Sequence, residues 1–233
     1  MNLNQIAPRV GYQDPRRYRR EAGFLFEGVQ LAGRRVLDVG CGQGALTVWA
    51  AAHGASSVVG LEPELDGSTA GSSEVLESVI HDFGLGDRVE LRRVRLDEFE
   101  SAAEFDLAIL HGVVNHLNEA AVVRLHRDPS AVDEYVAVLR PLRALLRQGA
   151  VVIVADCGRR SIWRTIGRQG PWTHHIEWEK HQQPHTWIKV FQRAGFEPLD
   201  VRWSPLRDTG RLTGNRFVQY FTMAHFVLRL RAV

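Results

Sequence analysis

The residues best suited to chemistry form a glycine-rich turn. Gly40, Gly42 and Gly44 follow the apolar run 35–39 and precede a helix-forming run that starts at Ala45. Glycines let bare backbone approach a ligand, because a Cβ atom would block that approach, and they tolerate positive φ. The free N–H groups and partial positive charge at the start of the following helix favour a carboxylate. The turn is therefore a candidate site for a ligand that carries a carboxylate.

Asp38 helps to distinguish between two classes of ligand for this turn. The glycines alone, spaced as Gly40-x-Gly42-x-x-Ala45, also fit a loop that binds a dinucleotide. Asp38 lies two residues before the first glycine, where its carboxylate can accept from a cationic amino group and would repel a pyrophosphate. The sequence thus favours a ligand with a cationic amino group. A nicotinamide enzyme that transfers hydride is the alternative from another reaction class.

The segment from Val36 to Gly44 resembles the first motif of the class I S-adenosylmethionine-dependent methyltransferases, Val-Leu-Asp-x-Gly-x-Gly-x-Gly. The resemblance covers nearly the whole chain and implies that the turn holds the methionine end of S-adenosylmethionine. Glu62, after the second predicted strand, matches the family's acid that binds both ribose hydroxyls, for which a carboxylate has enough acceptor sites. The cofactor-binding residues that we expect are Asp38, Gly40, Cys41, Gly42, Gly44, Glu62, Pro63, Leu96, Asp97 and His111.

The segment after the third predicted strand departs from the family pattern. Where the family has an acid and a small residue that contact adenine, this chain has Arg95 and Leu96, with Asp97 one place later. We expect the Leu96 backbone amide to contact adenine, because the amide is present whatever the side chain.

Histidines are the candidate catalytic residues. His111 and His116 follow the fourth predicted strand, in a segment that resembles the family's segment beside the methyl group and the acceptor. Neutral histidine titrates near pH 7 and can remove a proton from an acceptor hydroxyl. A structural role is the competing interpretation of His116.

The segment 172–187 supplies further candidates, because it combines histidines with tryptophans whose faces can stack on a ring or a sugar. His174, His175 and His181 are the alternative bases in this segment. The histidine spacing matches no common zinc pattern, so we expect no metal ion.

These residues predict methyl transfer to oxygen. In this reaction the cofactor supplies the reactive methyl group, and the protein aligns the acceptor and provides a base. His111-Gly112-Val113-Val114 stands where amino-methylating enzymes have an Asn/Asp-Pro-Pro-aromatic motif, which argues against methylation of nucleic-acid bases. We expect a small hydroxylated acceptor, such as a sugar or a biosynthetic intermediate. An RNA ribose methyltransferase and a non-catalytic partner subunit that binds S-adenosylmethionine are the alternatives.

Alternating apolar runs and helical segments must position these residues. The pattern predicts strands at 35–39, 57–61, 89–94, 105–110 and 150–155, helices at 45–52, 73–83, 132–146 and 187–194, and extended runs at 196–203 and 217–230. Pro141 should kink or restart its helix. Together with the resemblance, this pattern predicts an α/β fold: a Rossmann-like, seven-stranded, mostly parallel sheet with an antiparallel last strand and helices on both faces.

We expect one methyltransferase domain over residues 1–233. Residues 1–30 form a predicted helical cover, in which Tyr18 and Arg19 contact the acceptor or the cofactor carboxylate, or serve only packing. Residues 157–186 form a predicted substrate-recognition insertion, because ligands bind at the carboxyl ends of parallel strands.

Composition limits the class of protein. The 233 residues are 45% hydrophobic and 24% charged, as in an ordinary soluble enzyme. A formal charge of only +2 makes nucleic acid an unlikely partner. Two cysteines imply no disulfide framework, and neither a secretory signal nor an apolar run of about 18 residues is present. We therefore predict a cytoplasmic protein with no membrane span; the oligomeric state is not predicted.

Overall fold

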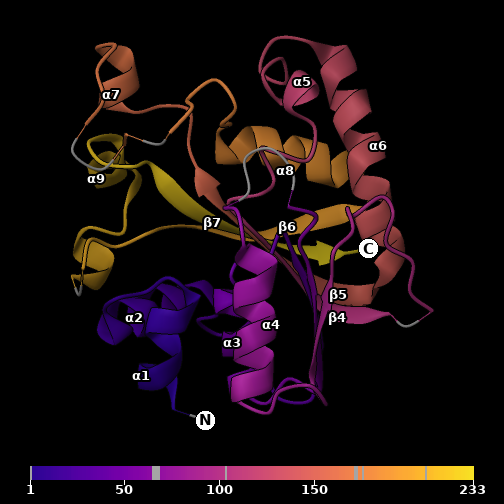
Figure 1. The fold of residues 1–233 in the computed structure, drawn as a ribbon. Helices are drawn as coiled ribbons and strands as arrows, with labels where there is room; N and C mark the ends of the chain where they lie inside the picture. The colour runs from indigo at the N-terminus through magenta and orange to yellow at the C-terminus, as the bar shows by residue number, and fades with distance from the viewer. Residues whose placement is uncertain (1, 65–68, 103, 171–172, 175, 208) are drawn as a thin grey trace. The chain divides into compact units, whose positions relative to one another are not determined.

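The computed structural model describes residues 2–64, 69–102, 104–170, 173–174, 176–207 and 209–233 (Figure 1). The described strands form a seven-stranded sheet in the order β3-β2-β1-β4-β5-β7-β6. The chain divides into two compact units, Met1–Leu110 with Leu145–Ala150, and His111–Ala144 with Val151–Val233. The glycine turn belongs to the first unit and the candidate histidines belong to the second.

In the first unit, parallel strands lead into the glycine turn. β1 (Arg35–Val39) pairs in parallel with β2 (Ser57–Leu61) on one side and with β4 (Phe105–His111) on the other, and β2 pairs with β3 (Val89–Arg92). β1 and β4 are buried along almost their whole length, as expected for strands covered on both faces. The helical elements of this unit are α1 (Leu3–Ile6), η1 (Ala7–Val10), α2 (Pro15–Leu25), α3 (Ala45–Ala52) and α4 (Ser72–Asp82).

In the second unit, an antiparallel strand brings distant parts of the chain together. β7 (His225–Ala232) lies between β5 (Leu146–Cys157) and β6 (Phe196–Trp203) and is antiparallel to both. The first residue of β7 therefore lies opposite the last residue of β5. The helical elements around them are α5 (Glu119–Val122), α6 (Pro129–Leu145), α7 (Ile162–Thr165), α8 (Pro184–Arg193), η2 (Gly210–Leu212) and α9 (Arg216–Tyr220).

Most predicted elements are confirmed. The bounds of β1, β2, β6 and α3 are those predicted, and α4 begins and ends one residue earlier than predicted. β3 is shorter than the predicted run, and β5 extends beyond both ends of the predicted 150–155. These elements were predictable because each has a strong apolar pattern of its own.

The prediction of one extended run over 217–230 is wrong at its start. Residues 216–220 form the helix α9, because the Asn215 Oδ1 atom accepts a hydrogen bond from the Val218 N–H group at 3.0 Å. Ala224, with a φ of 53°, then turns the chain into β7. The capping asparagine was the overlooked signal.

Pro141 was predicted to kink or restart its helix; the helix does not restart there, because α6 continues through Pro141. Leu139 and Leu142, on either side of the proline, are fully buried. We infer that their packing offsets the backbone hydrogen bond that proline cannot donate.

Candidate functional site

The glycine turn requires glycine at each of its three positions. Gly40, Gly42 and Gly44 have φ values of 65°, 52° and 81°, in the left-handed region that other residues rarely adopt. A Cβ atom on Gly44 would lie 2.3 Å from the Leu76 Cδ1 atom, so this glycine also lets α3 pack against α4. A Cβ atom on Gly42 would meet no atom within 4 Å, so the backbone there faces open space. This open backbone fits a ligand that must approach closely.

Glu62 holds the glycine turn in place. Its Oε2 atom accepts a hydrogen bond from the Gly42 N–H group at 2.8 Å, and its Oε1 atom accepts from the Glu64 N–H group at 3.1 Å. The side chain is only 4% exposed, and the half-buried Pro63 follows it. Because each carboxylate oxygen has two lone pairs, Glu62 can brace the turn and still accept hydrogen bonds from a ligand's hydroxyl groups.

Asp38 lies buried beneath the turn rather than open to solvent. Its Oδ2 atom accepts a hydrogen bond from the Thr47 hydroxyl at 2.7 Å, and the residue is 2% exposed. Burial raises the pKa of Asp38 to about 7, although the hydrogen bonds from Thr47 act in the opposite direction. A cationic group beside it would favour the ionised carboxylate. Thr47, in the first turn of α3, escaped the sequence prediction.

Cys41 packs against the second strand. A Cβ atom on Gly60 would lie 2.7 Å from the Cys41 Sγ atom, which explains a glycine inside β2. Burial raises the pKa of the Cys41 thiol well above its usual value, and burial does the same for Cys157. Both thiols are free and neither is activated as a nucleophile.

The predicted adenine-contacting residues differ in exposure. Leu96 is 6% exposed, in a turn after β3. Asp97 is exposed, and its Oδ1 atom forms an ion pair at 2.9 Å with the Arg95 Nε atom. The Asp97 carboxylate is thus engaged on the surface, whereas Leu96 lies in the protein interior.

The N-terminal segment packs on the glycine turn and on α3. A Cβ atom on Gly11 would lie 2.8 Å from the Gln43 Oε1 atom. The hydroxyl of Tyr18, in α2, donates to the Ala45 carbonyl at 2.6 Å, and its ring meets the Trp49 ring edge-on at 5.4 Å. Tyr18 is fully buried, which supports the packing role rather than contact with an acceptor. Arg19 donates to the Asn4 Oδ1 atom at 2.6 Å.

A buried histidine–aspartate pair lies in the second unit. The His181 Nδ1 atom is 2.9 Å from the Asp156 Oδ1 atom, and the two residues are 9% and 3% exposed. The Cys157 N–H group donates to the same oxygen at 2.8 Å, which fixes the carboxylate at the end of β5. In the described part of the chain, the buried Asp156 Oδ2 atom has no hydrogen-bond partner. This pairing holds the His181 ring in one orientation.

Two further histidines lie near this pair. His225 pairs with Cys157 across β7 and β5, and its ring lies 6.1 Å from the ring of the exposed His111. The His225 Nδ1 atom is 2.5 Å from the Ser204 hydroxyl. Burial, together with the charges of His111 and His181, lowers the pKa of His225 to about 3. Asp156 and His225 were missed because nothing local marks either as more than a strand residue.

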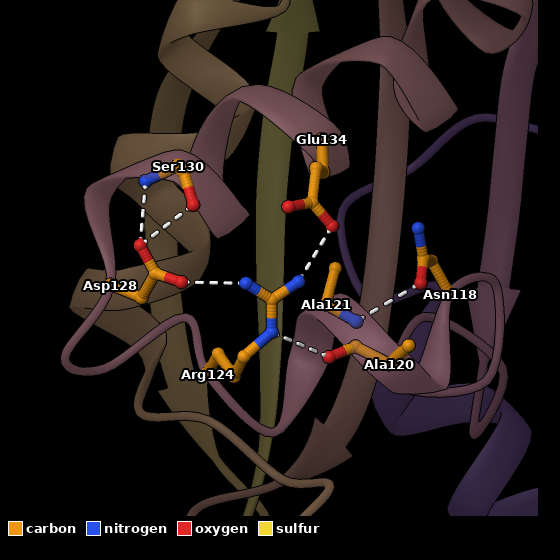
Figure 2. A network of polar contacts seen from close by, with 7 residues as sticks. All are labelled: Asn118, Ala120, Ala121, Arg124, Asp128, Ser130 and Glu134. Atoms are coloured by element: carbon orange, nitrogen blue, oxygen red, sulfur yellow. Dashed lines mark hydrogen bonds and ion pairs between the residues drawn. The ribbon is translucent and has the colours of Figure 1, made fainter.

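The segment after β4 is fixed by an arginine, which Figure 2 shows. The Arg124 guanidinium pairs with Asp128 at 2.6 Å and Glu134 at 2.7 Å, and donates to the Ala120 carbonyl at 3.0 Å. It thereby ties α5 to the start of α6. The Gln182 Nε2 atom donates to the Val122 carbonyl at 2.7 Å, so the residue beside His181 is anchored to the same segment.

The other predicted bases are not brought into this group. His116 is 2.7 Å from Glu119, which also pairs with Lys180 at 2.9 Å, in a surface network. His174 is exposed, with its Nδ1 atom 3.3 Å from the Gln169 Oε1 atom. His175 lies outside the described residues. Within the described ranges, no group of three or more His, Cys, Asp or Glu side chains could hold a metal ion.

Comparison with known proteins identifies the family. Residues 10–201 match the family model described as a methyltransferase domain. The chain is 28% identical over 195 residues to the ubiquinone biosynthesis O-methyltransferase of Azorhizobium caulinodans, covering 82% of this chain and 71% of that protein. It is 24% identical over 217 residues to the protein of the same name from Marinobacter nauticus, covering 86% and 81%.

Solved structures share the fold. A putative S-adenosylmethionine-dependent methyltransferase from Listeria monocytogenes superposes with a TM-score of 0.61 at 12% identity, over 93% of this chain and 98% of that one. Magnesium protoporphyrin IX methyltransferase from Synechocystis, with bound S-adenosylmethionine, gives 0.56 at 17% identity, over 100% and 85%. The cyclase SpnF gives 0.62 at 16% identity, over 94% and 82%. The predicted Rossmann-like methyltransferase fold is confirmed.

Replacement of Gly44 by alanine should destabilise the protein by roughly 3 kcal/mol or more, because the new Cβ atom meets Leu76 and the φ is positive. Gly33, with a φ of 74° and no atom within 4 Å of an added Cβ, is the matched control. Gly33→Ala should cost roughly 1 kcal/mol through backbone strain alone. Denaturant unfolding measures both, and equal losses would contradict the close packing at Gly44.

The buried Asp38 carboxyl should give the stability a specific pH dependence. Its raised pKa means that folded protein keeps a proton which unfolded protein releases between about pH 4 and about pH 7. Asp38 therefore destabilises the fold increasingly as the pH rises through this window. Asp38→Asn should remove that loss. The free energy of unfolding of the variant, compared with that of wild type, should therefore rise by a few kcal/mol from pH 4.5 to pH 8. Denaturant unfolding at both pH values tests this, and a constant difference would be the contrary result.

Proposed function

The chain belongs to the methyltransferase-domain family and uses S-adenosylmethionine as its methyl donor, and on this basis we propose that it methylates a hydroxyl oxygen of a small acceptor, with His181 as the base. The observation that carries the proposal is the buried hydrogen bond between His181 and Asp156. The donor supplies an electrophilic methyl group on a sulfonium, so the protein must align the acceptor and take up its proton.

At the cofactor end, we assign distinct roles to two carboxylates. Glu62, which already braces the glycine turn, accepts hydrogen bonds from the ribose hydroxyls, because a carboxylate can accept several hydrogen bonds at once. Asp38 faces the cationic amino group, whose charge offsets the cost of burying an ionised carboxylate. The N–H groups at the start of α3 favour the ligand's carboxylate. Backbone at Leu96 contacts adenine.

At the acceptor end, His181 is the histidine best placed to act as a base. The Asp156 carboxylate accepts a hydrogen bond from the Nδ1–H group, so that the Nε2 lone pair can receive a proton from an acceptor hydroxyl. Once His181 is protonated, the neighbouring carboxylate stabilises its charge. His116 also has a carboxylate partner, but that carboxylate is exposed and shared with Lys180.

The relatives and the surrounding aromatic residues support a hydroxylated ring or sugar as the acceptor. The curated relatives are described as O-methyltransferases, which favours oxygen as the methylated atom. The Trp178 ring lies 6.5 Å from that of His181, in an edge-to-face arrangement, and is 8% exposed. An aromatic wall beside a base suits a flat acceptor that carries a hydroxyl group.

Loss of the Glu62 carboxylate should weaken binding of S-adenosylmethionine about 10–100-fold, because hydrogen bonds to a charged acceptor contribute about 1.5–3 kcal/mol. Calorimetry with S-adenosylmethionine, S-adenosylhomocysteine and NAD should compare wild type with Glu62→Gln. Glu90→Gln, which removes an exposed carboxylate paired with Arg92, is the matched control and should bind normally. Binding of NAD in place of the adenosyl compounds would contradict the assignment of the cofactor.

Removal of the base should slow methyl transfer without weakening the binding of S-adenosylmethionine. His181→Gln should lower kcat about 10²–10⁴-fold, and Asp156→Asn at least about tenfold, with S-adenosylmethionine affinity unchanged. The defect of His181→Gln should shrink towards high pH, where a phenolic acceptor ionises unaided. The assay follows radiolabelled methyl transfer to a panel of phenols, catechols and sugars.

Two further variants make the assignment of the base falsifiable. His81→Gln, on a side chain that is 89% exposed, is the control and should retain full activity. His116→Gln tests the other histidine with a carboxylate partner. If His116→Gln abolished turnover while His181→Gln did not, the assignment of His181 would be wrong.

A further inference from the structure

Exposed apolar side chains gather on one part of the second unit. Among the described residues, eight large hydrophobic side chains are exposed, and six of them belong to the segments 162–169 and 204–223. Leu212 is 83% exposed and Phe217 is 74% exposed, far more than a core-forming residue. We call this the basic apolar face; its apolar members are Ile166, Leu206, Leu212, Phe217, Phe221 and Met223.

Contacts show that the two segments form one continuous surface. The Trp163 Nε1 atom, in α7, donates to the Phe221 carbonyl at 3.0 Å, just after α9. The Thr165 hydroxyl is 3.3 Å from the Tyr220 hydroxyl. Phe217 and Phe221 meet edge-to-face at 5.2 Å. α7 and α9 accordingly lie side by side (Figure 1).

The region around Leu212 joins the same surface. The Asn215 Nδ2 atom donates to the Leu212 carbonyl at 2.9 Å, so the cap of α9 holds η2 beside it. The Leu206 N–H group donates to the Thr213 hydroxyl at 2.8 Å. These hydrogen bonds connect Leu206 with Thr213 and Leu212 with Asn215, so these exposed apolar residues adjoin α9.

Arginines gather on this face as well. Six exposed arginines lie in and beside the two segments, and within the described ranges none forms an ion pair with a carboxylate; they are Arg160, Arg164, Arg168, Arg207, Arg211 and Arg216. Some exposed arginines elsewhere are paired with acids, for example Arg9 with Asp82 and Arg231 with Glu197. In the sequence the only acid within the two segments is Asp208. The face is therefore strongly positive on a chain whose net charge is only +2.

We propose that the basic apolar face binds the surface of an anionic lipid membrane. Protruding leucine and phenylalanine side chains can enter the boundary between headgroups and acyl chains, while unpaired arginines meet the anionic headgroups. A protein interface of this kind would need carboxylates to match the arginines and a flatter apolar centre. None of the described helices is long and apolar enough to cross a bilayer. The proposal does not depend on the acceptor or the base.

Vesicle co-sedimentation of the full chain tests the proposal. Vesicles that contain phosphatidylglycerol should bind the protein, vesicles of phosphatidylcholine alone should bind it far less, and raised salt should weaken binding. Leu212→Ser/Phe217→Ser should reduce partitioning at least about tenfold. Arg211→Gln/Arg216→Gln should reduce it about 25-fold, because each arginine near the surface contributes about a factor of five.

A matched charge control separates the face from net charge. Arg16→Gln/Arg88→Gln removes two exposed arginines from the first unit and should leave binding unchanged. Unaltered S-adenosylmethionine binding by every variant shows that the fold is intact. Absence of binding to anionic vesicles, equal loss in the control, or concentration-dependent dimerisation abolished by Leu212→Ser/Phe217→Ser would each overturn the proposal.

Discussion

The hydrogen bond between the Gly42 N–H group and the Glu62 carboxylate is the constraint on which the cofactor end depends. β1 and β2 are parallel and in register, with Val39 opposite Leu61, so the glycine turn and Glu62 leave the sheet at the same edge. The carboxylate fixes a turn whose positive φ values cost other residues strain. Beneath that turn, Asp38 is shielded from solvent, and Thr47 holds it from α3. The Gly42–Glu62 hydrogen bond thus holds the glycine turn, and the Thr47–Asp38 hydrogen bond joins the first turn of α3 to the buried carboxyl beneath it.

The sequence alone was sufficient wherever the signal was local. The strand–turn–helix segment 35–52 and the acid at Glu62 each have a nearby pattern, and the structure gives the predicted bounds. The histidine–aspartate pair was only half visible, because Asp156 and His181 are 25 residues apart and meet through tertiary structure. His225 was hidden inside a run that was taken to be wholly extended, since the cap at Asn215 and the turn at Ala224 went unrecognised. Residues that are far apart in the sequence and meet only in the folded protein produce no periodic pattern in the sequence, so such pairs could not be predicted from it.

The two units divide the chemistry in a way that explains why the donor is easier to identify than the acceptor. In our proposal, the donor is bound by the backbone of the glycine turn and by two carboxylates, which lie at the ends of the first two strands of the fold. The acceptor end that we propose uses side chains on irregular segments after β4 and β5, and such segments can vary without disturbing the sheet. The likeness to the cyclase SpnF, at a TM-score of 0.62, shows that the same architecture accompanies a differently named activity. Specific chemistry must therefore be argued from His181 and its neighbours.

The raised pKa of both thiols has a consequence for the reaction of the protein with oxidants. Because burial raises the pKa of Cys41 and Cys157, few thiolates form at neutral pH, and thiolates are the species that peroxide and alkylating reagents attack. Cys41 lies in the glycine turn itself, so an added oxygen or adduct on its sulfur would press against β2 at Gly60. Keeping this thiol protonated protects the donor-binding turn from damage. A cysteine introduced on the surface would, in turn, be the preferred point for attaching a spectroscopic label.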